Sequence, residues 1–178
     1  MTLNELLQSS GIPRGQSANL RNELAEDSSG SGRAKVYLHA GQLYASNRPT
    51  EIVTILGSCV SVCLFDASCG IGGLNHFMLP TDSITPSPRY LRHAMDMLLQ
   101  QLTAFGARRS RLQAKLFGGA SVLKSGETGM DLGGRNIEAA RARLALEQIP
   151  IVAEDVGGDR GRKLVFVTSD GTALIKQV

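Results

Sequence analysis

The distribution of polar and hydrophobic residues divides the chain into a polar N-terminal segment and a region of short apolar runs. Residues 1–33 have mixed charge and end in a Ser/Gly-rich run, a composition typical of flexible linkers. A short helix at Leu3–Leu7 has too few apolar partners to be stable alone. We therefore predict a flexible extension at 1–33, with a partner-docking arm as the alternative, and one domain at 34–178.

From Ala34 onward, short apolar runs bounded by turn residues predict β-strands. The expected strands are Lys35–Leu38, Glu51–Leu56, Val60–Phe65, Gly70–Leu79, Leu112–Phe117, Ile149–Val156, Lys163–Thr168 and Ala173–Lys176.

Two helices are predicted among these strands. Apolar residues recur at helical spacing over residues 91–105, and Gly106 then provides a stop. The second helix is expected at 136–148, after a glycine-rich loop at 118–134. Because strict alternation of strands and helices is absent, a doubly wound parallel sheet is disfavoured. The pattern predicts an α+β fold, a layered α/β sandwich with largely antiparallel sheets covered on their outer faces by helices.

The composition is that of a folded domain with many turns. Hydrophobic residues make up 42% of the chain, 20 residues are glycine, and tryptophan is absent. The net charge of +3 is too small and too scattered to indicate a nucleic-acid-binding protein. Arg108, Arg109 and Arg111 have no interleaved aromatic residues, so we interpret them as a solvated helix-end patch. We expect no nucleic-acid partner.

The cysteine count bears on the cellular compartment. Three cysteines cannot pair completely within one chain, which argues against a disulfide scaffold. The N-terminal residues lack the features of a secretory signal, and no apolar stretch is long enough to cross a bilayer. We expect a cytoplasmic location without membrane insertion. The sequence contains no cluster of metal-ligand residues, so neither a metal nor another cofactor is expected.

The segment Leu56–Asp66, with the sequence LGSCVSVCLFD, carries the strongest sign of chemistry. A strand runs into Gly57, which lets the backbone bend and leaves the amides of Ser58 and Cys59 open to an incoming group. Amides of this kind form oxyanion holes. Cys59 is therefore a candidate nucleophile; the alternative is a buried strand cysteine with a packing role.

The other two cysteines are weaker candidates. Residues four apart on one strand are separated by about 13 Å, too far for a disulfide between Cys59 and Cys63. That spacing also differs from those of zinc knuckles and redox dithiols. We predict that Cys63 lies in the core and that Cys69 is exposed in a turn.

A cysteine nucleophile needs a base, and the chain contains three histidines. His39 is expected in an early strand or turn, and His93 on the polar face of a helix. His76 lies on a strand joined by a tight turn to the strand that begins at Cys59, so an antiparallel return brings it toward the thiol. His76 is therefore the predicted base; the alternative is a packed or surface histidine.

Thr54 is the candidate for orienting the imidazole, because it ends the preceding strand and offers a hydroxyl. Asp66 is the rival carboxylate, but it lies at the turn end of the hairpin, away from Cys59.

A different motif suggests a different class of function. Residues 118–125, GGASVLKS, have the spacing of a phosphate-binding loop, but Leu123 stands where the second glycine is required. No clear acidic strand supplies a magnesium ligand. A nucleotide-binding regulator therefore stays only as an alternative.

Short motifs recur in order over residues 35–176: LGSCVSVCLFD from Leu56, GGLNHFMLP from Gly72, Arg89-Tyr90, KLFGGA from Lys115, GRN from Gly134, DVGG from Asp155 and GRK from Gly161. In these motifs the chain resembles the chemoreceptor glutamine deamidase family, CheD. The resemblance implies a fold similar to the catalytic domain of cytotoxic necrotizing factors. It also implies a catalytic Cys-His-Thr site, which falls on Cys59, His76 and Thr54, and we expect His76 to lower the thiol pKa so that Cys59 attacks as a thiolate.

The activity implied by the resemblance is hydrolysis of glutamine side chains on methyl-accepting chemotaxis receptors, a protein-glutamine glutaminase reaction in chemotaxis adaptation. The resemblance further implies receptor methylesterase activity and a CheC-type phosphatase as a partner. The rival interpretation is a non-catalytic regulatory binding module of the same pathway. A receptor helix must reach the thiol, so we expect a groove, and we hypothesise that Arg89, Arg92, Arg108 and Arg109 face that helix.

Overall fold

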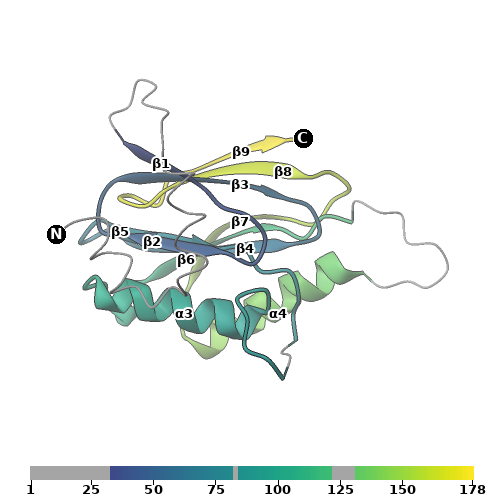
Figure 1. Cartoon of the computed structure of the whole chain (residues 1–178), viewed down its shortest axis with the longest axis horizontal. Coiled ribbons are helices and arrows are strands. Elements are labelled where there is room, and N and C mark those ends of the chain that lie inside the picture. Colours follow the sequence, from purple (N-terminus) through teal and green to yellow (C-terminus); the bar gives the residue numbers. More distant parts are fainter. Residues whose placement is uncertain (1–32, 82–83, 122–130) are drawn as a thin grey trace.

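A computed structural model of the chain describes residues 33–81, 84–121 and 131–178. The Leu3–Leu7 segment and nearly all of the predicted extension at 1–33 lie outside these residues. The described part is built in three layers, with two β-sheets stacked face to face and helices beneath one of them (Figure 1).

The first sheet forms an outer layer and has four strands in the order β1-β3-β8-β9. Its strands are β1 (Ala34–Tyr37), β3 (Thr50–Leu56), β8 (Arg162–Val167) and β9 (Ala173–Gln177). β1 runs parallel to β3, whereas β8 is antiparallel to both of its neighbours, β3 and β9.

The second sheet is the middle layer and has five strands in the order β2-β5-β4-β6-β7. Its strands are β2 (Leu43–Ser46), β5 (Ile71–Asn75), β4 (Val60–Asp66), β6 (Gln113–Gly118) and β7 (Ile151–Val156). Only the last pair, β6 and β7, is parallel.

The helices α3 (Leu91–Ala104) and α4 (Leu132–Leu146) both lie on the side of the middle sheet that faces away from the first sheet (Figure 1). A short 3-10 helix, η1 (Arg109–Arg111), follows α3 and leads into β6. Within the described part of the chain, the outer face of the first sheet has no helix on it.

Strand β4 is the centre of the fold, because all seven of its residues are buried. Alternate residues along a strand point to opposite faces. Val60, Val62 and Leu64 belong to the core beneath the helices, and Cys63 and Phe65 belong to the core between the two sheets. A strand that feeds two cores has little freedom to shift its register, because a shift by one residue would exchange the two faces.

The predicted α+β sandwich with largely antiparallel sheets is confirmed, with differences in detail. The pattern missed β2, a strand of only four residues. The strand expected at 70–79 is regular only to Asn75, because the Asn75 side chain accepts the Val62 N–H at 3.0 Å in place of a backbone partner. Beyond it, pairing continues as isolated bridges at Phe77 and Leu79.

Helix α4 begins at Leu132, within the loop predicted at 118–134. Asp131 caps its first turn by accepting the Gly134 N–H at 2.9 Å. A Cβ atom at Gly133 would lie 2.3 Å from the carbonyl oxygen of Gly119. Glycine is thus used here for close approach of helix and loop, which helix propensity alone does not reveal.

Candidate active site

The turn Gly57–Cys59 carries the chain from the first sheet into the middle sheet, and its carbonyl groups are all held by the protein. Ala120 N–H donates to Gly57 O and Gly119 N–H donates to Cys59 O, each at 2.8 Å. Ser58 O accepts from the side chain of Asn136 at 3.0 Å. The turn is therefore fixed by contacts from residues more than 50 positions away in the sequence.

The amides of this turn are available to a ligand. Among the described residues, neither the Ser58 N–H nor the Cys59 N–H has another residue as its acceptor. The Cys59 N–H instead lies close enough to its own thiol to hydrogen-bond it. An amide beside a thiol is well placed to stabilise an oxyanion if that thiol acts as a nucleophile.

The strand register brings Cys59 and His76 onto one face. Val60 and Phe77 form an antiparallel bridge in which each N–H donates to the other's carbonyl at 3.1 Å. Cys59 and His76 flank this bridge diagonally, a relation in which side chains are separated by about 7–8 Å or less. The hairpin return expected from the sequence is therefore present.

Thr54 contacts His76 from the other sheet. Its hydroxyl oxygen lies 2.9 Å from His76 Nδ1 and 2.7 Å from the carbonyl oxygen of Leu38. A backbone carbonyl only accepts, so the single hydroxyl hydrogen goes to Leu38 O and the oxygen accepts from Nδ1–H. This assigns His76 the tautomer in which Nε2 carries the lone pair. Nε2 is buried and has no hydrogen-bond partner among the described residues.

The backbone of His76 is pinned on both sides by the turn that precedes β2. His76 N–H donates to Gln42 O at 2.9 Å, and Gly41 N–H donates to His76 O at 2.7 Å. With its backbone and Nδ1 both fixed, the ring has one orientation, and only Nε2 remains for chemistry.

Burial sets the protonation states of the pair. Burial lowers the pKa of His76 from 6.5 to about 4, and the charge of His39 adds to this shift. Burial also raises the pKa of the Cys59 thiol, an effect opposed by the hydrogen bond from its own N–H. Both groups are therefore neutral at rest near pH 7, and His76 is a free base rather than the cationic partner of a preformed thiolate.

The remaining cysteines and Asp66 lie where they were expected. Cys63 is fully buried between the sheets, where burial raises the pKa of its thiol far above the usual range. Cys69 is exposed. Asp66 closes the far end of the hairpin by accepting from Ser68 N–H at 3.0 Å and from Arg108 N–H at 3.1 Å.

His39 and His93 lie on other elements than the hairpin. His39 is exposed in the turn before β2, and His93 is half-buried on α3.

Three residues beside the turn were not identified from the sequence. Asn136 is fully buried on α4 and binds the turn directly. Arg162, only 5% exposed, donates from its guanidinium to Gly118 O at 3.0 Å and to Gly157 O at 2.8 Å. Gly118 has a φ of +107°, and a Cβ atom there would lie 2.3 Å from Cys59 O. A single sequence does not show that a glycine or an arginine contacts a turn that lies far away along the chain.

The described part of the phosphate-loop motif has its amides in use. Gly119 N–H and Ala120 N–H both donate to the 57–59 turn, as given above, and Ser121 N–H donates to Gly158 O at 2.8 Å. A phosphate cradle needs such amides to be free. Leu123 and the rest of the motif lie outside the described residues.

Comparison with known proteins shows the family to which the chain belongs. Residues 78–177 match the family model described as CheD chemotactic sensory transduction. A relative from Anaeromyxobacter dehalogenans (strain 2CP-C), named probable chemoreceptor glutamine deamidase CheD 1, is 46% identical over 154 residues, which are 86% of this chain and 90% of that protein. This chain belongs to the CheD family.

Other similarities are more partial. A CheD relative from Paraburkholderia xenovorans (strain LB400), also named a probable chemoreceptor glutamine deamidase, is 43% identical over 152 residues, and the match covers 82% of this chain and 60% of that protein. The solved structure of Neisseria meningitidis protein NMB0706 aligns with 66% of this chain and 52% of that one at 15% identity and a TM-score of 0.32.

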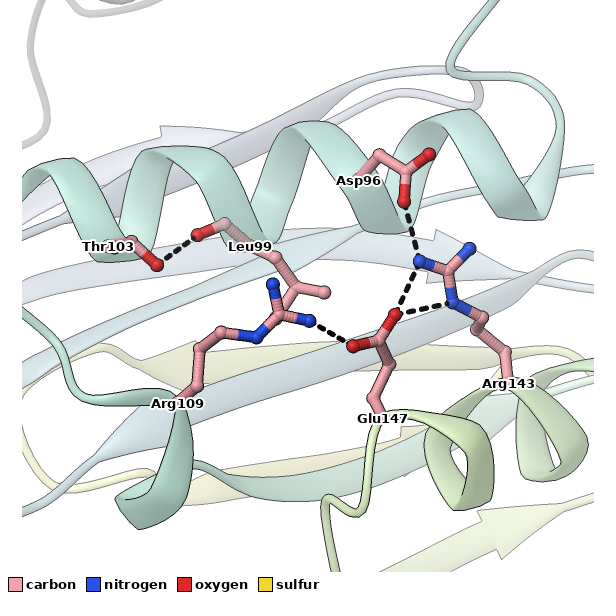
Figure 2. Close-up of polar contacts among 6 residues, drawn as sticks. All are labelled: Asp96, Leu99, Thr103, Arg109, Arg143 and Glu147. Atoms are coloured by element: carbon pink, nitrogen blue, oxygen red, sulfur yellow. Dashed lines mark hydrogen bonds and ion pairs between the residues drawn. The ribbon is translucent and has the colours of Figure 1, made fainter.

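The arginines proposed to face a receptor do not form one patch in this CheD-family chain. Arg89 lies beside the site, since a Cβ atom at Gly41 would be 2.8 Å from its Cγ. Arg108 binds Asp66, so it lies at the opposite end of β4, roughly 20 Å along the strand from Cys59. Arg109 is ion-paired with Glu147 (Figure 2).

A groove of about 590 Å³ runs along the first half of α4 beside β7, near the candidate site of this CheD-family chain. It is lined by Asp131, Gly134, Arg135, Ile137, Glu138, Arg141 and Val156. Cys59 and His76 do not line it.

A search of residues 33–81, 84–121 and 131–178 finds no group of three or more His, Cys, Asp or Glu side chains able to hold a metal ion. The same residues include no helix long and apolar enough to span a membrane.

Proposed function

We propose that this protein hydrolyses glutamine side chains of chemoreceptors to glutamate, with Cys59 as nucleophile and His76 as base. The observation that carries the proposal is the fixed imidazole: Thr54 holds Nδ1, and the unpartnered Nε2 belongs to a ring that lies diagonally across the strand pair from Cys59. The names of the CheD relatives, chemoreceptor glutamine deamidases, supply the substrate class.

In the first half-reaction, His76 Nε2 takes the Cys59 thiol proton as the sulfur attacks the amide carbon of the glutamine side chain. A C–S bond forms and the carbonyl π-bond opens to an oxyanion, which the N–H groups of Ser58 and Cys59 stabilise. The imidazolium then protonates the amide nitrogen. The C–N bond breaks, ammonia leaves, and a thioester on Cys59 remains.

In the second half-reaction, neutral His76 accepts a proton from water as the water oxygen attacks the thioester carbon. The C–S bond breaks, glutamate is released, and the proton returns to the Cys59 sulfur. The low pKa of His76 keeps the ring neutral before each proton is taken and makes the imidazolium a strong acid toward the leaving nitrogen, at the cost of a weaker base.

The test is incubation of the whole chain with a receptor cytoplasmic fragment, followed by mass spectrometry of its glutamine-containing peptides and by an assay for released ammonia. We expect conversion of particular glutamines to glutamate with one ammonia for each. Binding of the fragment without any conversion would refute the proposal and favour the regulatory binding module.

The same thiol chemistry extends to a methyl ester, because attack on an ester and on an amide forms the same thioester. Receptor methylesterase activity is therefore a second activity of the proposed site, and it is measured as methanol released from a methylated fragment. A CheC-type phosphatase partner and a cytoplasmic location rest on the family resemblance and the cysteine count, and both stay predictions.

A further inference from the structure

Asn136 joins the nucleophile side of the candidate site to the histidine side. It lies in the second turn of α4 and is fully buried. Its side-chain nitrogen donates to Ser58 O at 3.0 Å and to Met78 O at 2.9 Å. Ser58 directly precedes Cys59, and Met78 follows His76 by two residues. One amide group thus uses both of its hydrogens to tie together the two strands that carry the reacting side chains.

The bond to Ser58 O has a directional consequence for Cys59. A trans peptide unit is planar, with its C=O and the following N–H pointing in opposite directions. When Asn136 holds the carbonyl of Ser58 toward α4, the N–H of Cys59 points away from α4. That N–H is a proposed oxyanion donor, so the position of Asn136 sets the aim of a group that would contact the reacting oxygen.

The side chain of Asn136 is held here for its donor hydrogens and not for its oxygen. Its Oδ1 is buried with no hydrogen-bond partner among the described residues. An apolar side chain of similar size would avoid that unpaired acceptor but would leave Ser58 O and Met78 O without their donor. The asparagine is therefore explained by the two carbonyl groups that it holds.

The chain brings α4 close enough for this contact. The close approach of Gly133 to Gly119 and the Asp131 cap fix the first turn of the helix beside the 118–121 loop. The same loop holds the carbonyls of Gly57 and Cys59. Asn136 supplies the remaining carbonyl contact of the turn, the one on the peptide unit that ends in the Cys59 N–H.

We propose that Asn136 is a positioning residue for the oxyanion, acting through the Ser58–Cys59 peptide unit. The inference rests on the proposed Cys59–His76 mechanism. This positioning role differs from a role in activating the thiol. The side-chain hydrogen bonds of Asn136 go to Ser58 O and Met78 O, and not to the Cys59 sulfur or the His76 ring.

The test compares two reactions of the same thiol in a Cys69→Ala background, which removes the exposed cysteine. Deamidation of a receptor fragment needs an oxyanion donor; alkylation by iodoacetamide does not. For Asn136→Leu we expect kcat to fall at least about tenfold and up to a hundredfold, with KM within about twofold. The rate of Cys59 alkylation at high pH, where the thiol is ionised in both proteins, should match that of the parent. The midpoint of the pH dependence should stay or rise, because the Cys59 N–H lowers the pKa of its own thiol.

Controls separate the possible failures. The reaction is established first, by showing that the parent protein converts glutamine and that Cys59→Ala abolishes this conversion. An unchanged kcat in Asn136→Leu then counts against the positioning role alone. Leu144→Ala removes a buried side chain from the same helix, far from the turn, and should lower the melting temperature without lowering kcat. A folded Asn136→Leu variant with unchanged kcat, or with a lower alkylation rate at high pH than the parent, would overturn the proposal.

A second variant keeps the test decisive if Asn136→Leu fails to fold. Asn136→Asp preserves the shape, and its carboxyl donates a hydrogen only when protonated. We expect its kcat relative to the parent to rise as the pH is lowered, because a protonated carboxyl can again donate to Ser58 O. A ratio independent of pH would contradict the positioning role.

Discussion

Two polar clusters at different places on the fold illustrate two uses of polar side chains. The site cluster, Thr54, His76 and Asn136, is buried and neutral, and its hydrogen bonds cross from one layer of the fold to another. The ion-pair cluster, Asp96, Arg109, Arg143 and Glu147, joins α3, η1 and α4 on the helical side (Figure 2).

The ion-pair cluster is charged and open to solvent at its ends. The side chains of Arg109 and Asp96 are each 55% exposed, whereas those of Arg143 and Glu147, 2.6 Å apart, are 17% and 16% exposed. Water and salt weaken such pairs, and long side chains can re-pair at small cost. In the site cluster no water competes, so losing one partner leaves another group buried and unpaired. Only the buried contacts can fix a tautomer or the aim of an amide.

The largest effect should come from removing the base. His76→Gln keeps the approximate shape of the ring but cannot accept the thiol proton. We expect kcat for glutamine conversion to fall by about 10²–10⁴-fold, the usual contribution of a general base. His93→Gln, on the half-buried histidine of α3, is the matched control and should leave kcat unchanged. Equal rates for wild type and His76→Gln would remove His76 from the mechanism.

The next effect concerns stability in acid. The pKa of His76 is 6.5 in an unfolded chain and about 4 in the fold. Between these values the unfolded chain binds a proton that the fold does not, so the free energy of unfolding falls as the pH is lowered from 6.5 to 4. The loss should be about 3 kcal/mol. Denaturant titration at several pH values should show this loss in wild type and not in His76→Gln.

A smaller effect is expected at Thr54. Thr54→Val keeps the shape but leaves His76 Nδ1 and Leu38 O unpaired, which should cost about 1–2 kcal/mol of transition-state stabilisation, or about tenfold in kcat. Thr54→Ser retains the hydroxyl and should keep most of the activity. The orienting role fails if the valine and serine variants have the same kcat.

The smallest effect should come from the ion-pair cluster. Glu147→Gln removes the charge that Arg109 and Arg143 share, and we expect it to lower the free energy of unfolding by about 1 kcal/mol or less. The difference should shrink at high salt, and kcat should not change. A tenfold loss of kcat would mean that the ion-pair cluster is coupled to the site cluster, and it would contradict the difference between them.

Much of the local architecture could be predicted from sequence periodicity. The β4–β5 hairpin, α3 and the closing strands follow from alternation, helical spacing and turn residues, and these signals lie within a few residues of the elements they describe. Strand β2 was not predicted, because its four residues, Leu43–Ser46, are too few to show alternation. The start of α4 was placed too late, because a glycine-rich sequence indicates a loop, whereas Gly133 and Gly134 allow close contacts with Gly119 and Asp131.

The residues of the candidate site also divide into those that a local pattern could bring together and those that it could not. Cys59 and His76 are joined by one hairpin, so sequence spacing could bring them together. Thr54 reaches His76 from the other sheet, and Asn136 reaches Ser58 across 78 positions of the chain. Such contacts depend on how layers stack, which no local pattern records. Thr54 could still be named, because the family resemblance and its hydroxyl pointed to it, whereas Asn136 and Arg162 lay in the motifs GRN and GRK with no sign of the contacts that they make.

The central claim is that the Cys59 thiol performs the deamidation, and the most direct measurement compares two cysteine variants on one receptor fragment by mass spectrometry. Cys69→Ala removes an exposed thiol in the hairpin turn, and Cys59→Ala removes the thiol that lies diagonally across the strand pair from His76. We predict that glutamine-to-glutamate conversion continues at the wild-type rate in Cys69→Ala and is abolished in Cys59→Ala. Conversion that persists in a folded Cys59→Ala protein would contradict the account.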